Sequence, residues 1–211
     1  SKRLPGKNIK KFCGKPLIAR TIAIARKVSY IDKIVVSTDS EKIAKIARQH
    51  RADVPFIRPQ KLARVRSKTM DVILHAMNFF EKNSCVFDVI ILLQPTSPLR
   101  SKVDIERAFK MFVEKKAKAV VSVHPASVGD SLANTLPRDL NMHRFLEKSI
   151  TNKKVYKING AIYISDWNFI KKNKGWYSKK TFAFIMNKRN SIDIDEKEDF
   201  LAAEGLARNR S

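Results

Sequence analysis

Short apolar runs alternate with segments of helical periodicity along this 211-residue chain, and that rhythm limits the folds open to it. β-Branched and apolar residues gather at 33–38 (KIVVST), 89–93 (VIILL) and 119–123 (AVVSV). Between these runs, 69–82 and 101–116 repeat apolar residues every three or four positions, as the buried face of a helix does. Strands that alternate with helices through short connections predict a parallel sheet covered by helices on both faces.

The remaining segments continue the rhythm. Further strands are predicted at 54–57, 161–165 and 182–186, and further helices at 16–28, after Asp39 or Ser40, and at 196–208. Ser101, with Asp104 three residues later, resembles a capping box at a helix start. VIILL is the most apolar strand, so we expect it at the sheet centre. The elements predict one α/β domain over residues 1–211, a three-layer αβα fold with a mostly parallel, Rossmann-like sheet.

One long segment, 125–157, interrupts this rhythm. It carries two prolines, a glycine and scattered polar residues with weak periodicity. A segment of this length without regular elements usually serves function or contacts a partner. We therefore expect an extension of the domain here.

The charge is strongly basic, with 43 Lys and Arg against 20 Asp and Glu and a net charge of +23. Such a field attracts polyanions, including nucleotides, sugar acids and nucleic acids. The basic residues are spread along the chain with few aromatics among them, which favours a generally basic surface over a nucleic-acid site. No apolar run is long enough for a membrane span, and the first residues lack a secretory core, so we expect a cytoplasmic protein without a membrane partner.

In open parallel sheets, ligands bind beyond the carboxyl ends of the strands. Polar residues that suit such a site are Ser1, Lys2, Lys7, Asn8, Arg58, Gln94, Thr96, Ser97, Lys157, Asn159, Gly160, Asp193 and Asp195. Basic groups and loop amides suit a triphosphate, and carboxylates suit the Mg²⁺ that accompanies it. The phosphate-loop pattern GxxxxGK[ST] and the dinucleotide pattern GxGxxG are absent, so ATPase and dehydrogenase functions lose their main support.

Two short motifs, SIDID and QPTSPLR, are candidate ligand sites. In SIDID, Asp193 and Asp195 face the same way when extended, roughly 7 Å apart, and can hold one or two hard cations. The alternative is that they cap the helix that starts near Glu196. In QPTSPLR, two prolines stiffen the chain and present Gln94 and Thr96 as fixed polar groups for a sugar or base. The residues alone indicate a basic, Mg²⁺-using, nucleotide-linked α/β enzyme.

The motifs SKRLPGKN, FCGKPLI, VVSTD, LLQPTSPLR, NGAIYI and SIDID occur in that order over nearly the whole chain. In this they resemble the CMP-sialic acid synthetases, the cytidylyltransferases of N-acetylneuraminate and of relatives such as legionaminate. The resemblance implies Mg²⁺-dependent transfer of CMP from CTP to a nine-carbon acidic sugar, with release of pyrophosphate. It also implies a homodimer in which 125–157 reaches the partner subunit.

The resemblance implies a role for each matching residue. Nucleotide-binding residues would be Ser1, Lys2, Lys7, Asn8, Arg58, Ser67 and Thr69; sugar-binding residues Gln94, Thr96, Ser97, Lys157, Asn159 and Gly160; catalytic residues Lys7, Asp193 and Asp195, the aspartates as metal ligands. The family has a further strand and an Arg-Gly-Gly-like loop before the position of Ser1, and commonly Arg at the position of Lys157. These departures leave open a relative that binds CTP or the sugar acid without reaction. Nucleic-acid binding is the remaining alternative.

Overall fold

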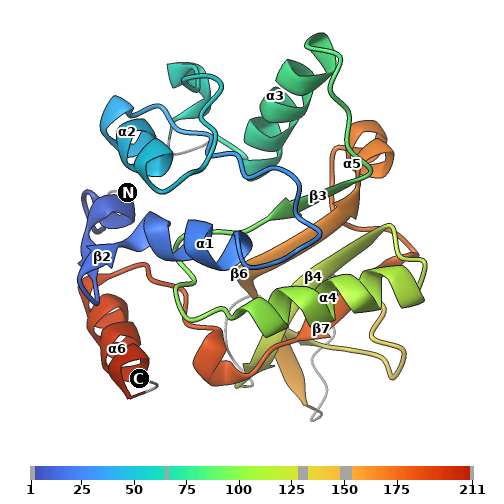
Figure 1. The fold of residues 1–211 in the computed structure, drawn as a ribbon. Coiled ribbons are helices and arrows are strands. Elements are labelled where there is room, and N and C mark those ends of the chain that lie inside the picture. Colours follow the sequence, from blue (N-terminus) through green and yellow to red (C-terminus); the bar gives the residue numbers. More distant parts are fainter. Residues whose placement is uncertain (1–2, 65–66, 128–132, 148–153, 210–211) are drawn as a thin grey trace.

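The computed structural model describes residues 3–64, 67–127, 133–147 and 154–209 (Figure 1). Its α-helices are α1 (Leu17–Ala25), α2 (Glu41–Gln49), α3 (Thr69–Lys82), α4 (Lys102–Glu114), α5 (Trp167–Asn173) and α6 (Lys197–Arg208). Its strands are β1 (Lys11–Phe12), β2 (Lys15–Pro16), β3 (Val89–Leu92), β4 (Ala119–Ala126), β5 (Ala133–Thr135), β6 (Val155–Asp166) and β7 (Thr181–Ile185). The 3₁₀ turns are η1 (Lys7–Ile9), η2 (Gln60–Leu62) and η3 (Lys188–Asn190).

Side-chain caps fix where the helices begin. The Ser40 hydroxyl accepts from the Ile43 amide at the start of α2, so Ser40 is the cap and Asp39 is not. The capping box predicted at Ser101 and Asp104 is present at the start of α4. Because these local patterns satisfy amides that a helix leaves open, they could be predicted from sequence.

The main sheet has the order β3–β6–β4–β7, and β5 pairs with β6. β6 runs antiparallel to both β3 and β4, and only β4 and β7 form a parallel pair of named strands. The expectation of a mostly parallel sheet is therefore wrong. β6 returns beside β4 without a helical crossover between them in the described chain, and strands connected in this way pair antiparallel.

The apolar VIILL run lies at one end of this strand order rather than at its centre. All four residues of β3 are only partly buried, whereas the first five residues of β4 are buried. The runs at 33–38 and 54–57 meet in isolated parallel bridges at Val35–Asp53 and Thr38–Ile57 and do not form extended strands. Apolar residues favour burial, but they do not encode which strands become neighbours.

Helices cover both faces of the sheet, as expected. On one face α3 and α5 pack through Ile73, Met77 and Ile170 against Val121 and Val123. On the other face α4 packs against the sheet, and its buried residues join those of β6 and β7 in a second cluster. A third cluster joins α6 to the residues before and inside α1. The three-layer arrangement is thereby confirmed.

A break in the pairing of β6 shapes the functional end of the sheet. Val121 pairs with Tyr163 but Val123 pairs with Ile158, so residues 159–162 of β6 lie opposite Ser122 alone. Bulges of this kind bend a strand and redirect its side chains, and they are frequent beside active sites. Here the bulge contains the NGAI part of the NGAIYI motif.

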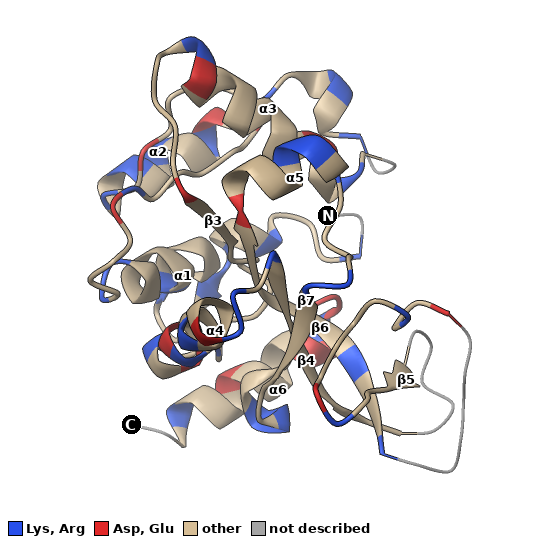
Figure 2. Cartoon of the chain, turned by 90° about the vertical axis from the view of Figure 1, so that its right-hand side faces the viewer, with Lys and Arg blue, Asp and Glu red and all other residues tan. Residues whose placement is uncertain are grey.

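The segment 125–157 is less irregular than its sequence predicts. β4 extends to Ala126, β6 begins at Val155, and β5 pairs with the first part of β6 at the side of the main body (Figure 2). Lys and Arg are distributed over helices and loops throughout the chain (Figure 2). Within the described residues, no helix has the length and apolar character that a membrane crossing requires.

Candidate active site

Two motifs predicted to bind ligand lie directly against each other. The Ile194 amide donates to the Thr96 carbonyl at 2.8 Å. The Thr96 hydroxyl also hydrogen-bonds to the Asp193 carboxyl. These bonds join the loop after β3 to the segment before α6, although about a hundred residues of sequence separate them. The QPTSPLR and SIDID motifs therefore form one surface.

Gly160 brings the β6 bulge to the same place. A Cβ atom on Gly160 would lie 2.5 Å from Gln94 Oε1 and 3.8 Å from Asp193 Oδ2. Gly160 also has φ = +70°, a conformation that favours glycine. The Gln94 amide and the Asp193 carboxylate thus both lie close to one backbone position that has no room for a side chain.

Lys7 contacts the same SIDID segment. It lies in η1, which follows Gly6 at φ = +65°, and it is only 8% exposed. Its ammonium donates to the Ile194 carbonyl and lies 3.5 Å from Asp195 Oδ1. Arg3 reaches the same carboxylate at 2.9 Å. The basic loop at the start of the chain therefore packs along the SIDID segment.

The two aspartates differ in their electrostatic surroundings. Asp195 has two cations beside it, whereas Asp193 has no ion pair within 4.0 Å to any described residue. Desolvation by neighbouring atoms raises the pKa of the Asp193 carboxyl; the Thr96 hydrogen bond opposes this, and Asp195 adds to it. Asp193 is the carboxylate whose negative charge is less well compensated, and it would gain most from an added cation.

These carboxylates suit a magnesium ion that arrives with a nucleotide. Neither side chain is needed to cap α6, because Asp199 accepts from the backbone amides of Asp195 and Glu196, each at 2.9 Å. No group of three His, Cys, Asp or Glu ligands occurs in the described chain, so any cation here takes further ligands from elsewhere. Mg²⁺ is typically held by one or two carboxylates together with substrate phosphates and water.

A cavity of about 330 Å³ opens next to Gln94. Its walls come from the start of α3, the end of β3, β6 and the turn after α5: Thr69, Met70, Leu92, Gln94, Tyr163, Lys174, Gly175, Trp176 and Tyr177. The rings of Tyr163 and Trp176 lie 4.9 Å apart, and burial raises the pKa of Tyr177 to about 12. The sequence did not point to Trp176 and Tyr177 because α5 and its following turn were not predicted, whereas Tyr163 lies in the strand predicted at 161–165.

Two residues assigned to the sugar lie inside the protein. Asn159 is 2% exposed; its Oδ1 accepts from the Ser122 hydroxyl at 2.5 Å and its Nδ2 donates to the Ser191 hydroxyl at 3.0 Å. Ser97 is fully buried and its hydroxyl has no hydrogen-bond partner in the described chain. The Asn159 side chain links β4, β6 and the first residue of SIDID, so it supports the site from the interior.

The remaining predicted residues are more scattered. Arg58 forms an ion pair with Asp39 at 2.8 Å, and the Ser67 hydroxyl donates to the Lys61 carbonyl at 3.2 Å. Asn8 lies in η1 beside Lys7, and Lys157 lies in β6, where it pairs with His124 of β4 and Ala133 of β5. Ser1 and Lys2 lie outside the described residues. No hydrogen bond or ion pair within these ranges joins Arg58 or Ser67 to the Lys7–Asp195 pair.

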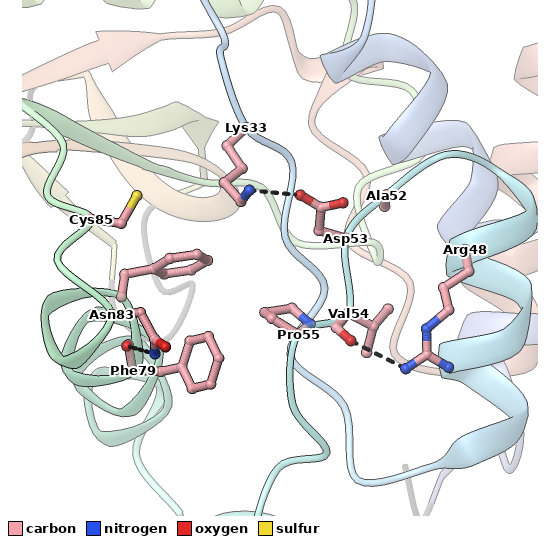
Figure 3. A pocket seen from close by; sticks show the side chains of 10 residues that line it. Lys33, Arg48, Ala52, Asp53, Val54, Pro55, Phe79, Asn83 and Cys85 are labelled. Atoms are coloured by element: carbon pink, nitrogen blue, oxygen red, sulfur yellow. Dashed lines mark hydrogen bonds and ion pairs between the residues drawn. The ribbon is translucent and has the colours of Figure 1, made fainter.

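A second cavity, of about 570 Å³, lies at the other end of the strands (Figure 3). Its walls come from the ends of α2 and α3 and from nearby loop residues: Lys33, Arg48, Ala52, Asp53, Val54, Pro55, Phe79, Phe80, Asn83 and Cys85. Its charged groups are satisfied within the protein: Lys33 pairs with Asp53 at 3.1 Å, and Arg48 donates to the Val54 carbonyl at 3.1 Å (Figure 3). Gln94 follows β3 at the opposite end, so this cavity is separate from the candidate site.

Solved structures share this fold. The chain is similar to CMP:2-keto-3-deoxy-manno-octonic acid synthetase complexed with CTP, with a TM-score of 0.79 and 15% identity over 100% of this chain and 95% of that one. It is also similar to 4-diphosphocytidyl-2C-methyl-D-erythritol synthase from Anaerococcus prevotii, with a TM-score of 0.63 and 13% identity over 95% and 93% of the two chains. At such identities the likeness concerns the fold.

Sequence comparisons are closer. Residues 1–209 match the family described as "Cytidylyltransferase". The chain is 39% identical to the CMP-N,N'-diacetyllegionaminic acid synthase of Legionella pneumophila, over 98% of this chain and 91% of that protein. It is 32% identical to an Escherichia coli N-acylneuraminate cytidylyltransferase over 95% of this chain and 48% of that protein, so it spans about half of this relative. The chain therefore belongs to the cytidylyltransferase family, in its acylneuraminate branch, and is a nucleotidyltransferase.

Proposed function

We propose that this enzyme transfers CMP from CTP to a nine-carbon acidic sugar and releases pyrophosphate. The observation that carries the proposal is the convergence at Gly160, where an amide suited to a sugar and a carboxylate suited to a metal–triphosphate lie close together. The names of the relatives from Legionella pneumophila and Escherichia coli support the same reaction class.

The proposed arrangement assigns the triphosphate to Lys7, Asp193 and Asp195. The buried Lys7 ammonium contributes positive charge where the phosphates carry negative charge, and it is already held in place by the Ile194 carbonyl. When bound, Mg²⁺ supplies further charge neutralisation for the triphosphate. Asn8, Arg58 and Ser67, with Ser1 and Lys2, stay predicted contacts of the nucleotide. Thr69, predicted with them, lines the cavity beside Gln94.

The sugar acid is assigned to the cavity beside Gln94. Gln94 and Thr96 come from the stiff loop after β3, so they orient the sugar with little loss of freedom on binding. The anomeric hydroxyl then attacks the α-phosphorus of CTP in line, and pyrophosphate leaves. Gly160 keeps the space between sugar and carboxylate open.

We further propose that the sugar is of the diacylamino type, as in legionaminate, ahead of N-acetylneuraminate. Met70, Leu92 and the three aromatic residues give one part of the cavity an apolar wall, beside the polar Thr69, Gln94 and Lys174. Apolar walls favour acylamino methyl groups and deoxy carbons over hydroxyl-rich tails. The relative named for N,N'-diacetyllegionaminic acid, at 39% identity, supports this choice. A homodimer formed through 125–157 and a cytoplasmic location remain predictions.

Pyrophosphate release from CTP and Mg²⁺ tests the proposal. The full chain is assayed with N,N'-diacetyllegionaminate, N-acetylneuraminate and pseudaminate in parallel, with Asp193→Asn as the matched control for contaminating activity. We expect the wild-type protein to turn over, with the highest kcat/KM for the legionaminate. The Asp193→Asn variant should lose nearly all of this signal. CTP binding without product from any of the three acids would instead favour a non-catalytic relative.

A further inference from the structure

Arg100 is a charged residue in the interior that none of the assigned roles uses. It ends the QPTSPLR motif and is the largest of the fully buried side chains, at 1% exposure. Burial lowers the pKa of its guanidinium to about 10, which Asp104 partly opposes. A cation in such a place costs folding free energy unless its hydrogen bonds compensate for lost water.

The guanidinium connects three separate parts of the chain. Its Nη1 donates to the Gln94 carbonyl at 3.1 Å and to the Ala161 carbonyl at 2.8 Å. Its Nη2 donates to the Thr21 hydroxyl of α1 at 3.0 Å. One of these carbonyls belongs to Gln94 itself, and the other to the residue that follows Gly160. Arg100 therefore connects the backbone of the loop after β3 to the backbone of the β6 bulge, from the interior of the protein.

Carboxylates do not explain why the charge is present. Arg100 makes no ion pair with any carboxylate in the described ranges, and its Nε has no hydrogen-bond partner there. The neighbouring Asp104 is engaged by the Ser101 amide and hydroxyl and by the Asn190 side chain. For stability alone, an apolar side chain of similar volume would avoid the cost of burying a cation.

The other bonds within the loop are weaker. The Ser97 amide lies 3.3 Å from the Gln94 carbonyl, the Arg100 amide 3.4 Å from the Ser97 carbonyl, and Arg20 Nε 3.4 Å from the Pro98 carbonyl. At the Thr96 end, the 2.8 Å bond to the Ile194 amide fastens the loop to the SIDID segment. Without Arg100, the loop would stay attached at Thr96 but lose its shortest restraint at Gln94.

We propose that Arg100 is a positioning residue that sets the place of Gln94 relative to Gly160, and so governs binding of the sugar acid more than binding of CTP. The proposal rests on the assignment of Gln94 to the sugar. Lysine cannot replace the planar guanidinium, because one ammonium cannot span two carbonyls and a hydroxyl in these directions.

Steady-state kinetics of Arg100→Lys and Arg100→Met test this, with the exposed Arg107→Lys on α4 as the matched control. We expect the KM for the sugar acid to rise at least about tenfold in both Arg100 variants, because a change of this size corresponds to the loss of one charged hydrogen bond. The KM for CTP should stay within about twofold. Arg107→Lys should change neither. Thr21→Val, which removes one partner and keeps both carbonyl bonds, should give a smaller rise for the sugar acid alone. Equal changes in both KM values, or none, would overturn the proposal.

Hydrogen–deuterium exchange keeps the test independent of turnover. In Arg100→Met we expect faster exchange at 94–100 and 160–162 and unchanged exchange in α6. If the wild-type protein turns over no sugar acid, the proposed function fails, and the exchange experiment still decides whether Arg100 holds the loop. Unchanged exchange at 94–100, or acceleration spread over the whole chain, would contradict a positioning role.

Discussion

The two loops that border the candidate site are held in different ways. The loop at 94–100 is fastened from inside by a fully buried guanidinium and a short backbone bond to Ile194. The loop at 3–8 is fastened partly by the buried Lys7, which donates to the Ile194 carbonyl, and partly by Arg3, which is 61% exposed in its pairs with Asp195 and Glu196. Hydrogen bonds in the interior define geometry, whereas exposed ion pairs are weak and screened by salt. The sugar side is therefore preset, whereas the phosphate side is held in part by exposed ion pairs that salt screens.

The same contrast separates the two aspartates. Asp195 belongs to the ionic side, because Lys7 and Arg3 both approach it. Asp193 belongs to the preset side through its hydrogen bond with Thr96. The two aspartates of SIDID therefore have different roles. The charge of Asp193 is poorly compensated, whereas the charge of Asp195 is compensated by the cations of the 3–8 loop.

The largest effect expected is loss of catalysis in Asp193→Asn. The amide keeps the shape and removes the charge, and removal of one electrostatic contact to a reacting centre lowers kcat by roughly 10²–10³-fold. Asp195→Asn should lose less, and the exposed Asp32→Asn should lose nothing. Pyrophosphate release under saturating substrates measures all three. Equal losses at 193 and 195 would erase the proposed difference between the aspartates.

Gly160→Ala should be next in size. The new methyl group would lie 2.5 Å from Gln94 Oε1, and the residue would keep φ = +70°, so Gln94 must move. We expect the KM for the sugar acid to rise about tenfold, equivalent to about 1.4 kcal/mol, with a smaller change for CTP. Gly205→Ala on α6 is the control, since a Cβ there meets nothing within 4 Å and helix propensity favours alanine. Unchanged sugar binding in Gly160→Ala would refute the crowding argument.

In the 3–8 loop, an effect of similar size is expected at Lys7 and a smaller, salt-sensitive effect at Arg3. Lys7→Met removes a buried charged hydrogen bond and should raise the KM for CTP about tenfold. Arg3→Ala removes exposed pairs and should change it less than about threefold, an effect that disappears near 0.5 M salt. Kinetics at two salt concentrations distinguish these outcomes. A larger effect at Arg3 than at Lys7 would reverse the expected ranking.

The smallest effect expected is on stability. The pKa of Asp193 is raised in the folded protein, mainly by desolvation, so the folded state binds its proton more tightly than the unfolded state. Stability from this group therefore falls as pH rises from the ordinary carboxyl range through the raised pKa. Asp193→Asn cannot ionise and should melt at a higher temperature than wild type at neutral pH. Thermal melts from pH 3 to 8 should converge at the acid end; a lower melting temperature at neutral pH would contradict the sign.

Local chemistry explains what the sequence predicted well. The ends of α3 agree with the apolar periodicity of 69–82, and Ser101 begins α4 through its own side chain. Non-local pairing explains the failures. The direction of β6 and the position of β3 depend on strands that are distant in the sequence. The apolar pattern of a strand does not determine which strands become its neighbours. The cavity aromatics come together only because β6 and the turn after α5 meet in space.

The candidate site follows the same division. Motif order brought Gln94, Thr96, Gly160, Asp193 and Asp195 to attention, and the structure brings them together. It could not reveal that Asn159 faces inward or that Arg58 pairs with Asp39, because burial and partner choice depend on the folded packing. Arg100 was noted only as the end of the QPTSPLR run, because nothing in its sequence context distinguishes a buried arginine from a surface one.

A crystal structure with CTP and Mn²⁺, an ion that carboxylate and phosphate oxygens bind much as they bind Mg²⁺, tests the central claim most directly. We predict an anomalous peak about 2.0–2.3 Å from carboxylate oxygens of Asp193 and Asp195, with the triphosphate beside Lys7 and the α-phosphate facing Gln94. A metal–nucleotide bound at the opposite end of the strands, near Lys33 and Arg48, would contradict it.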